Sequence, residues 1–467
     1  MIDLPNDIES LKELIYRLLE ENAQLRKEIA QLKAENAELR RRLEADSGNS
    51  HKPPSSDGYK KKTTKPGLPK DGSKKRGGQT GHKGNTLKRV SVPDRIEIHR
   101  PQHCSCCGRH FSAEEAQETS QSRQVFDLPE PKLEIIEHRL AQVECCGRHH
   151  VGEYPQEVTA SVQYGPGVRA LVTKLSIDHR MPLAQISLLF EDLFGYDLNS
   201  TTIEETLERV HALAEPLEQQ IIAGLLDGDL AHFDETGLRV AGKLHWLHVA
   251  SSDTLTYLYL HEKRGKEALN DPASILNRFT GTAVHDCWKP YFQFPQVRHV
   301  LCGAHLLREL QSEQENGSRW AGEMQQLLMT LYKGERPLGD SEQARLHYRR
   351  ILDQADQEEP QPAPRQKGQR GRIKQSKGRN LLDRLRTHEE GVLAFAFEAD
   401  VPFTNNQAER DLRPSKVKQK ISGGFRTQAG AQVYARLQAV IPTFRKQEIG
   451  VFKALRNLFS GKPVELA

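Results

Sequence analysis

The sequence predicts a multidomain protein, in which a long amphipathic helix and a cysteine-containing module precede a mixed α/β core with a helical insertion. A heptad repeat runs through the N-terminal segment, and two short cysteine clusters follow it. The period of the apolar residues then changes from that of a helix to that of a strand at Asp229. A chain of 467 residues is also longer than one compact domain usually is. We therefore expect several folded units.

Residues 1–46 carry apolar side chains at two positions of a heptad repeat, and asparagine interrupts one of them. One position holds Leu11, Leu18, Leu25, Leu32 and Leu39, and the other holds Ile8, Ile15, Asn22, Ile29, Asn36 and Leu43. Buried asparagine pairs fix the register and the number of strands in a coiled coil. The pattern predicts a parallel two-stranded coiled coil, and hence a homodimer or a higher assembly. One long helix packed on its own domain is the alternative.

Residues 47–98 are basic and rich in Gly, Pro and Ser. Residues 51–100 contain fourteen Lys and Arg against four acidic residues. Too few apolar side chains are present to offset the entropy lost on folding, so we expect a flexible linker. Segregated positive charge of this kind suits the phosphates of a nucleic acid, and a solvated tail is the alternative.

Residues 99–156 contain two cysteine knuckles, each followed by glycine. Two knuckles joined by a short strand segment indicate a zinc-ribbon-like module with structural Zn²⁺. The expected ligands are Cys104, Cys107, Cys145 and Cys146. Adjacent cysteines do not readily bind one ion together, so His149 or His150 is an alternative ligand at the second knuckle. A ribbon that has lost its metal is the other interpretation.

The seven cysteines are too few for a disulfide scaffold in a chain of this length, which indicates a reducing compartment. The sequence contains no secretory signal and no apolar run of about eighteen residues. We expect a cytoplasmic, nucleoid-associated protein that does not contact a membrane.

Residues 160–222 have helical periodicity. The segment 182–194 is followed by a break from Gly195 to Leu198, and Asn199 then caps a second helix that runs to about Ala214. A helix, a short turn and a capped helix are the parts of a DNA-binding helix-turn-helix. Two ordinary packed helices have the same pattern, and the glutamates of the second helix are poor neighbours for phosphate, so DNA binding by this pair stays open.

Residues 225–430 are expected to form the catalytic core, with an insertion at about 308–400, and residues 431–467 a helical tail. Expected strands cover 230–240, 244–250, 255–261, 282–286 and 297–302, with a helix at about 266–279. Three antiparallel strands, a helix and two further strands are compatible with a ribonuclease H-like α/β fold. The insertion contains helical stretches and a basic loop at 358–379, which either lies on DNA or is a disordered connector.

Asp234 lies on the first expected strand of this core, and Asp286 ends the fourth. In the expected fold these strands are neighbours, so the two carboxylates meet. Hard divalent cations such as Mg²⁺ or Mn²⁺ prefer carboxylate oxygens. Two such ions activate the attacking oxygen and stabilise the leaving oxygen of a phosphodiester. We regard His232 and His285, which lie near the two aspartates, as structural.

A third carboxylate is expected in the helix that begins near Asn405, where Glu409 and Asp411 compete. Residues 410–456 contain eleven Lys and Arg against two acids, so cations surround this helix. The expected DNA contacts are Arg308, Arg413, Lys416, Lys420 and Arg426. Cys302 and His305 have the spacing of half a zinc site but no evident complement, which favours a packing role.

Six strings, in order along the chain, resemble the insertion-sequence-66 family of transposases. They are NSHKPPSSD at 49–57, the cysteine knuckles, HFDETG at 232–237, HDCWKPY at 285–291, CGAHLLREL at 302–310 and NNQAER at 405–410. The resemblance implies an Asp-Asp-Glu triad on Asp234, Asp286 and Glu409, and so favours Glu409 over Asp411. It also implies an N-terminal zipper, a zinc module and a helical insertion. The second cysteine knuckle lacks two spacer residues of the family pattern.

The expected function is DNA transposition. Two-metal hydrolysis of a phosphodiester at the ends of an insertion sequence would be followed by strand transfer. The partners would be the terminal inverted repeats, target DNA and accessory proteins encoded by the element. A non-catalytic DNA-binding regulator and a structure-selective nuclease on the same core are the alternatives.

Overall fold

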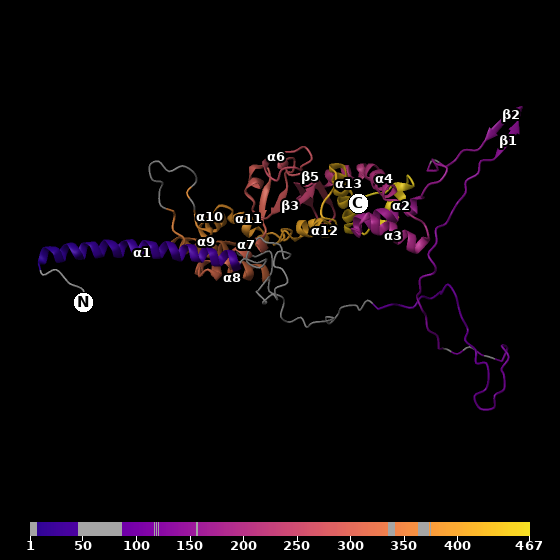
Figure 1. The fold of residues 1–467 in the computed structure, drawn as a ribbon, viewed down its shortest axis with the longest axis horizontal. Coiled ribbons are helices and arrows are strands. Elements are labelled where there is room, and N and C mark those ends of the chain that lie inside the picture. Colours follow the sequence, from indigo (N-terminus) through magenta and orange to yellow (C-terminus); the bar gives the residue numbers. More distant parts are fainter. Residues whose placement is uncertain are drawn as a thin grey trace.

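A computed structural model of the chain describes residues 7–44, 86–115, 117, 119, 121–155, 157–334, 341–362, 373 and 375–467. Most of the expected linker and part of the basic loop at 358–379 lie outside these residues. Figure 1 shows a body of helices around one sheet, from which the first helix and a small hairpin extend in opposite directions. Within the described part of the chain, no helix is both long and apolar enough to cross a lipid bilayer.

The N-terminal helix α1 (Ile8–Glu44) is continuous. Its seam residues face solvent in the single chain, with Leu18 52%, Leu25 55% and Leu32 63% exposed. The expected helix is therefore confirmed. Its pairing with a second copy stays a prediction.

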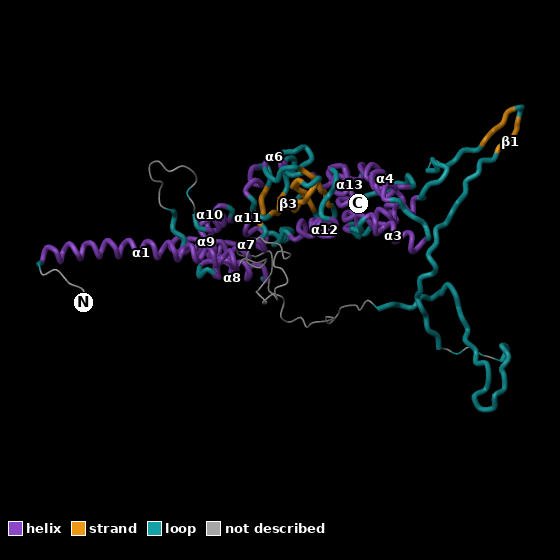
Figure 2. The backbone as a smooth tube through the Cα atoms, in the orientation of Figure 1, coloured by secondary structure: helices purple, strands orange, loops and turns teal. Residues whose placement is uncertain are grey.

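The cysteine-containing region has one small sheet, formed by β1 (Gln142–Cys145) and β2 (Arg148–Val151). Cys146 and Gly147 join the strands with φ of 53° and 70°. Two central residues with positive φ make a type I′ turn, which matches the twist of a hairpin. The second cysteine knuckle is thus the tip of a hairpin, at the end of the extended arm in Figure 2.

The helical region consists of α2 (Pro166–Thr173), a π-helical turn η2 (Lys174–Asp178), α3 (Leu183–Phe194), α4 (Ser200–Leu213) and α5 (Glu215–Asp227). Gly195 ends α3 with φ of 72°, and the Asn199 side chain accepts the Thr201 N–H at 2.9 Å to cap α4. Both features agree with the sequence. The helices α2, α4 and α5 share a core with the C-terminal helices α13 (Gln428–Lys446) and α14 (Val451–Phe459).

The central sheet contains β3 (Leu230–Val240), β4 (Lys243–Ser251), β5 (Thr256–His261), β6 (Thr282–His285) and β7 (Arg298–Leu301). Its order is β5-β4-β3-β6-β7. The first three strands are antiparallel, and β6 and β7 run parallel to β3. Three consecutive antiparallel strands followed by two further strands agree with the expected mixed α/β sheet.

The helix expected at about 266–279 is wrong in length, because α6 covers only Lys266–Leu269. Pro272 follows shortly afterwards, and proline does not continue a helix. Asp271 Oδ1 instead accepts the Ala273 N–H at 2.8 Å, which begins a turn.

Helices cover both faces of the sheet, because apolar side chains along its strands point to both faces. In β5, Leu258 packs in a cluster with Ala408 and Leu412 of α12 (Asn406–Ser422), whereas its neighbours Tyr257 and Tyr259 belong to a different cluster. Side chains on a strand point alternately to the two faces, so both faces are buried. Residue 430, the expected end of the core, lies inside α13, which packs against β5.

The insertion is helical, as the sequence indicates. It contains α7 (Gly303–Glu315), α8 (Arg319–Lys333), α9 (Ser341–Glu358), α10 (Lys377–Thr387) and α11 (Glu389–Phe397). These helices form a second core with Val284, Val300 and Leu301 of the sheet. A 3₁₀ turn, η3 (Lys289–Gln293), connects β6 with the segment before β7.

Candidate active site

Asp234 lies in β3, and Asp286 directly follows β6, the parallel neighbour of β3. The last pair in the ladder between β3 and β6 is His232 with Val284. Each aspartate follows its member of this pair by two residues, so both lie just beyond the paired part of the two strands. Neighbouring strands lie about 4.8 Å apart. The structure therefore brings both predicted acids to the carboxyl end of β6.

A tight turn orients the Asp286 carboxylate. Its Oδ1 accepts the Trp288 N–H at 2.9 Å, and the Cys287 N–H donates to His285 Nδ1 at 3.1 Å. Cys287 has φ of 71°, a conformation that residues other than glycine rarely adopt. Such strain persists where the surrounding structure holds it, and it clusters at functional sites.

The buried His285 and the half-buried His299 support this turn. Because His285 Nδ1 accepts a hydrogen bond, its Nε2 carries the proton and donates to His299 Nδ1 at 3.0 Å. His299 Nε2 then donates to the Phe294 carbonyl at 3.1 Å. Burial lowers the pKa of both rings, which keeps them neutral. His285 thus makes structural hydrogen bonds, as the sequence suggests.

The acids of this region repel one another. Burial raises the pKa of Asp234 well above its usual value, and Glu235, Asp286 and Glu409 raise it further. Burial also raises the pKa of Glu409, and Asp286 adds to that shift. Glu409 therefore lies within electrostatic range of both aspartates.

Glu409 and Asp411 point in different directions. They are two residues apart, which is about 200° around a helix. Asp411 is buried and accepts hydrogen bonds from Ser251 Oγ at 2.5 Å, Thr256 Oγ1 at 2.9 Å and Lys446 Nζ at 2.8 Å. Asp411 is an anchor of α12 on the sheet and α13. Glu409 lies on the other side of the helix, among the acids.

Asn405, at the start of α12, ties this helix to the strand of Asp234. Asn405 is fully buried; its Nδ2 donates to the Phe233 carbonyl at 2.8 Å, and its Oδ1 lies 2.9 Å from His232 Nδ1. Since the amide nitrogen faces a carbonyl, His232 is the donor in the second bond. The sequence indicates Asn405 only as a helix cap, because its partners lie 172 and 173 residues away.

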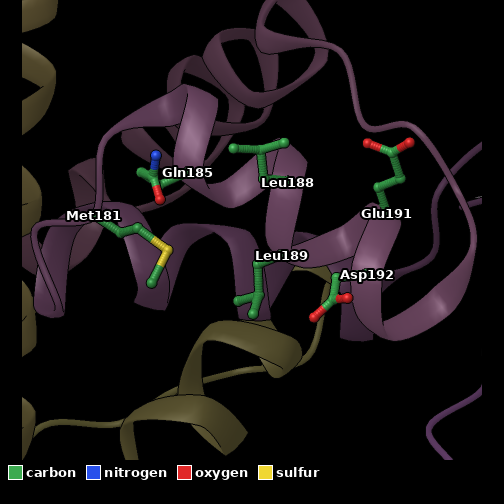
Figure 3. A pocket seen from close by; sticks show the side chains of 6 residues that line it. All are labelled: Met181, Gln185, Leu188, Leu189, Glu191 and Asp192. Carbon is green, nitrogen blue, oxygen red and sulfur yellow. The ribbon is translucent and has the colours of Figure 1, made fainter.

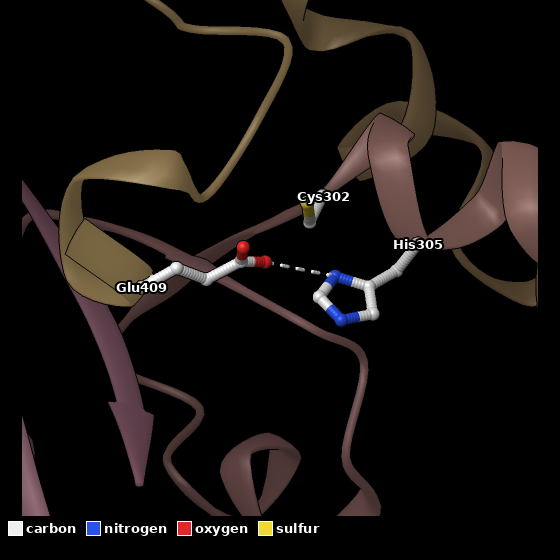
Figure 4. A group of neighbouring side chains, drawn as sticks. All are labelled: Cys302, His305 and Glu409. Atoms are coloured by element: carbon white, nitrogen blue, oxygen red, sulfur yellow. Dashed lines mark ion pairs between the residues drawn. The ribbon is translucent and has the colours of Figure 1, made fainter. Parts of the chain in front are cut away.

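Cys302, His305 and Glu409 meet between α7 and α12 (Figure 4). One ligand atom from each lies within 4.8 Å of the other two, and His305 Nδ1 is 3.7 Å from Glu409 Oε1. Among the described residues, this is the group of three side chains that meets such a distance limit, and Asp234 and Asp286 are not in it. The sequence predicts only a packing role for Cys302 and His305, whereas the fold brings Glu409 next to them.

Glu235, the residue after Asp234, is a buried acid that the sequence does not single out. Its carboxylate accepts hydrogen bonds from Tyr291 Oη at 2.5 Å and Arg264 Nε at 2.7 Å. The Arg264 guanidinium lies 5.0 Å from the ring centroid of Trp246 and 4.3 Å from that of Trp288. This cluster links β3 and β4 to the segment after Asp286.

Sequence comparison with known families identifies the chain. A family described as Transposase IS66 family matches residues 161–433, which is more than half of the 467 residues. The chain belongs to this family. A second family, described only as a family of unknown function (DUF6444), matches residues 4–88. No curated protein sequence matches the chain. As an IS66-family transposase, the protein acts on DNA.

Cations of this transposase gather on one side of Glu409. Arg308 Nη2 lies 4.0 Å from Glu409 Oε1. Burial raises the pKa of Glu409, and Arg308 and Arg413 oppose that shift. Lys416 Nζ, further along α12, donates to the Gly237 carbonyl of β3 at 2.6 Å. Three of the five expected DNA contacts therefore flank the acids or the strand of Asp234.

Lys420 and Arg426 are exposed at the far end of α12. The loop after the helix is fastened to the β3–β4 hairpin, because the Phe425 N–H donates to the Arg239 carbonyl at 2.8 Å and the Ala241 N–H donates to the Phe425 carbonyl at 2.8 Å. The structure thus places Arg426, the residue after Phe425, beside the tip of a hairpin whose first strand contains Asp234.

The four expected zinc ligands of the transposase are free cysteines in two groups. Cys104 and Cys107 belong to a turn that the Gly108 N–H closes on the Cys104 carbonyl at 2.9 Å. Cys145 and Cys146 have sulfurs 3.6 Å apart at the hairpin tip. Over the described residues, the structure does not bring the two groups within ligand distance of each other. Zinc binding there stays a prediction.

A surface hollow of about 560 Å³ lies beside α3 (Figure 3), and Asp234, Asp286 and Glu409 are not among the residues that line it. It is lined by Met181, Gln185, Leu188, Leu189, Glu191 and Asp192. The exposed side of α4 is also acidic, with Glu204, Glu205 and Glu208. These charges are unfavourable near DNA phosphates. DNA binding by this helix pair stays a prediction.

Proposed function

We propose that this transposase hydrolyses a phosphodiester bond at each end of an insertion sequence and joins the exposed 3′-hydroxyl to target DNA. In this proposal Asp234, Asp286 and Glu409 are the catalytic carboxylates of a ribonuclease H-like core, and they hold two divalent cations, Mg²⁺ or Mn²⁺. The supporting observation is that Asp234 and Asp286 both lie two residues beyond the last pair of the β3–β6 ladder, with Glu409 in electrostatic range.

The donor set fits hard divalent cations. Mg²⁺ and Mn²⁺ prefer carboxylate oxygens to nitrogen or sulfur. Burial and mutual repulsion raise the pKa of Asp234 and Glu409, so a bound cation would favour the ionised form of both. When bound, such cations supply the positive charge that activates the attacking oxygen and stabilises the leaving oxygen.

The chain's own cations would hold the DNA strand over these acids. Arg308 and Arg413 lie beside Glu409, and Lys416 lies beside β3. Lysine and arginine side chains bind phosphates without reading the base sequence. In-line displacement at phosphorus depends mainly on positioning and charge stabilisation, so this arrangement supplies what the reaction needs.

The remaining regions would recognise DNA and assemble the transposase. Residues 1–46 would pair with a second copy, since the seam of α1 is exposed in the single chain. Residues 47–98, the cysteine module at 99–156 with its Zn²⁺, and the helices of 160–222 would bind the terminal inverted repeats. Accessory proteins encoded by the element are further expected partners.

Strand transfer with labelled element ends in Mg²⁺ tests the proposal. Asp234→Ala should abolish both cleavage and joining, whereas Asp253→Asn, an exposed aspartate in the β4–β5 turn, should leave both unchanged. Joining by the Asp234→Ala variant at the parent rate would contradict the assigned site. Cleavage without joining by the parent would indicate a nuclease, and DNA binding without either reaction would indicate a regulator.

A further inference from the structure

Three side chains of different chemistry converge beside the acids. Cys302 directly follows β7 and precedes α7, His305 lies in the first turn of α7, and Glu409 lies in the first turn of α12. The spacing of three residues puts Cys302 and His305 on one side of the α7 N-terminus. Figure 4 shows Glu409 pointing at them from the opposite helix.

The distances suit a small tetrahedral ion. Metal bonds of about 2.0–2.3 Å require ligand atoms roughly 3.3–3.8 Å apart. His305 Nδ1 and Glu409 Oε1 already lie 3.7 Å apart, and all three ligand atoms lie within 4.8 Å of one another. Binding therefore needs side-chain shifts of about 1 Å or less.

The sulfur of Cys302 is prepared for a metal in two ways. It is 1% exposed, and it accepts the Asn405 N–H at 3.1 Å. Burial raises the pKa of this thiol to about 11, and the backbone N–H groups of Asn405, His305 and Ala304 oppose that shift. N–H donors aimed at the sulfur would stabilise a metal-bound thiolate.

The chemistry of the three ligands selects the class of ion. One thiolate, one imidazole and one carboxylate suit borderline ions such as Zn²⁺ and Co²⁺, whereas Mg²⁺ prefers oxygen alone. Arg308, 4.0 Å from Glu409, adds a positive charge nearby that weakens binding of any cation. Three protein ligands leave one tetrahedral position open to water.

We propose that Cys302, His305 and Glu409 form a site for Zn²⁺ or a similar borderline divalent cation. Binding breaks the S–H bond of Cys302, releases its proton to solvent and forms a metal–sulfur bond. Glu409 is shared with the proposed Mg²⁺ site, so the two kinds of ion compete for it. The competition rests on the proposed function, but the existence of the site does not.

Cobalt chloride is the probe for the site, because Co²⁺ bound to a thiolate gives a near-ultraviolet charge-transfer band. The full chain is used with the other exposed or partly exposed cysteines changed to serine, namely Cys104, Cys106, Cys107, Cys145 and Cys146. This leaves Cys287 and Cys302. We expect the band in this background, its loss with Cys302→Ser, and its retention with Cys287→Ser.

His305→Gln keeps the Cys302 sulfur and should weaken Co²⁺ binding at least about tenfold. In metal sites, a loss of this size already results from changing a residue that only hydrogen-bonds to a ligand. This variant keeps the test valid if Cys302→Ser does not fold, which circular dichroism would reveal. Absence of the band in the five-serine background, or an unchanged Co²⁺ affinity in His305→Gln, would overturn the site.

A separate experiment tests the competition for Glu409. It measures Mn²⁺ binding by electron paramagnetic resonance. Zn²⁺ should weaken Mn²⁺ binding in the five-serine background, and His305→Gln should reduce this effect at least about tenfold. Equal Zn²⁺ sensitivity in both would overturn the shared ligand. Mn²⁺ binding that Asp234→Asn leaves unchanged would count against the proposed function, whereas a missing cobalt band with normal Mn²⁺ binding would remove this inference alone.

Discussion

The acids of the sheet and the acid of α12 are held in different ways. Asp234 lies in β3 and Asp286 directly follows β6, and the parallel pairing of these two strands ends two residues before each acid. Glu409 lies on a helix that reaches the sheet through side chains, namely Asn405 at one end and Asp411 in the middle. Strand pairing thus positions two acids, and side-chain hydrogen bonds position the third.

This difference separates a fixed half of the site from an adjustable half. The Asp286 turn is held by backbone N–H groups that donate to the side chains of His285 and Asp286, and by the hydrogen bond between His285 and His299. Glu409 instead has His305 and Arg308 as neighbours, and the charge of Asp286 repels it. We infer that the sheet supplies the rigid part and α12 supplies the part that responds to its neighbours.

The largest effect is expected from the fixed half. Asp286→Asn keeps the size of the side chain and its bond with the Trp288 N–H but removes a charged ligand. We expect cleavage of labelled ends to fall by about 10³-fold or more, with the unfolding midpoint retained to within a few degrees. A loss below about tenfold would mean that Asp286 does not act in the reaction.

The next largest effect is on stability. Lys446→Met removes the cation that lies 2.8 Å from buried Asp411, which leaves an unpaired charge and should cost about 3–5 kcal/mol in urea unfolding at pH 7. Adding Asp411→Asn should recover part of this loss. Lys453→Met, on an exposed position of α14, is the control. Equal stability of the two lysine variants would refute Asp411 as the anchor of α12.

A smaller effect is expected where the helix meets β3. Asn405→Ala removes the bonds to Phe233 and His232, so Glu409 should be less well positioned while the aspartates stay in place. We expect the cleavage rate to fall by about 10–100-fold and stability to fall by about 1–3 kcal/mol. Asn406→Ala, at the exposed next residue, should do neither. If Asn405→Ala lowered the cleavage rate as much as Asp286→Asn, the two halves of the site would be equally sensitive to substitution, and the distinction between them would be wrong.

Local patterns were sufficient to predict the sheet and its two aspartates. Alternating apolar residues and turn residues located β3 at 230–240 as observed, and strand order placed Asp286 at the end of a strand next to that of Asp234, which agrees with the pairing of β3 and β6. The helix expected at 266–279 failed because Asp271 and Pro272 favour a turn, a local signal that outweighed the helical spacing.

Contacts between distant segments were not predictable from local patterns. Glu409 and Asp411 both fit an acid one turn into a helix, and only the fold shows that Ser251, Thr256 and Lys446 enclose Asp411. Cys302 and His305 likewise lacked a complement in the sequence, because Glu409 follows them by more than one hundred residues. Periodicity shows which face is buried but not which distant side chain meets it.

The smallest effect tests the repulsion that both halves share. Folding raises the pKa of Asp234, so its contribution to stability is fully present below the unfolded value of about 3.9 and is lost as pH rises through the folded value. At neutral pH without divalent cations, this carboxylate therefore destabilises the fold. Asp234→Asn should raise the unfolding midpoint in EDTA by about 2–4 °C for each kcal/mol of repulsion removed.

Mg²⁺ should produce a similar rise in the parent by offsetting the same charge, and a smaller one in Asp234→Asn. Asp253→Asn, which removes an exposed aspartate, should match the parent in both conditions. Differential scanning fluorimetry in EDTA and in Mg²⁺ measures all three proteins. If Asp234→Asn melts with the parent in EDTA, the acids do not repel one another strongly, and the adjustable position of Glu409 would need another cause.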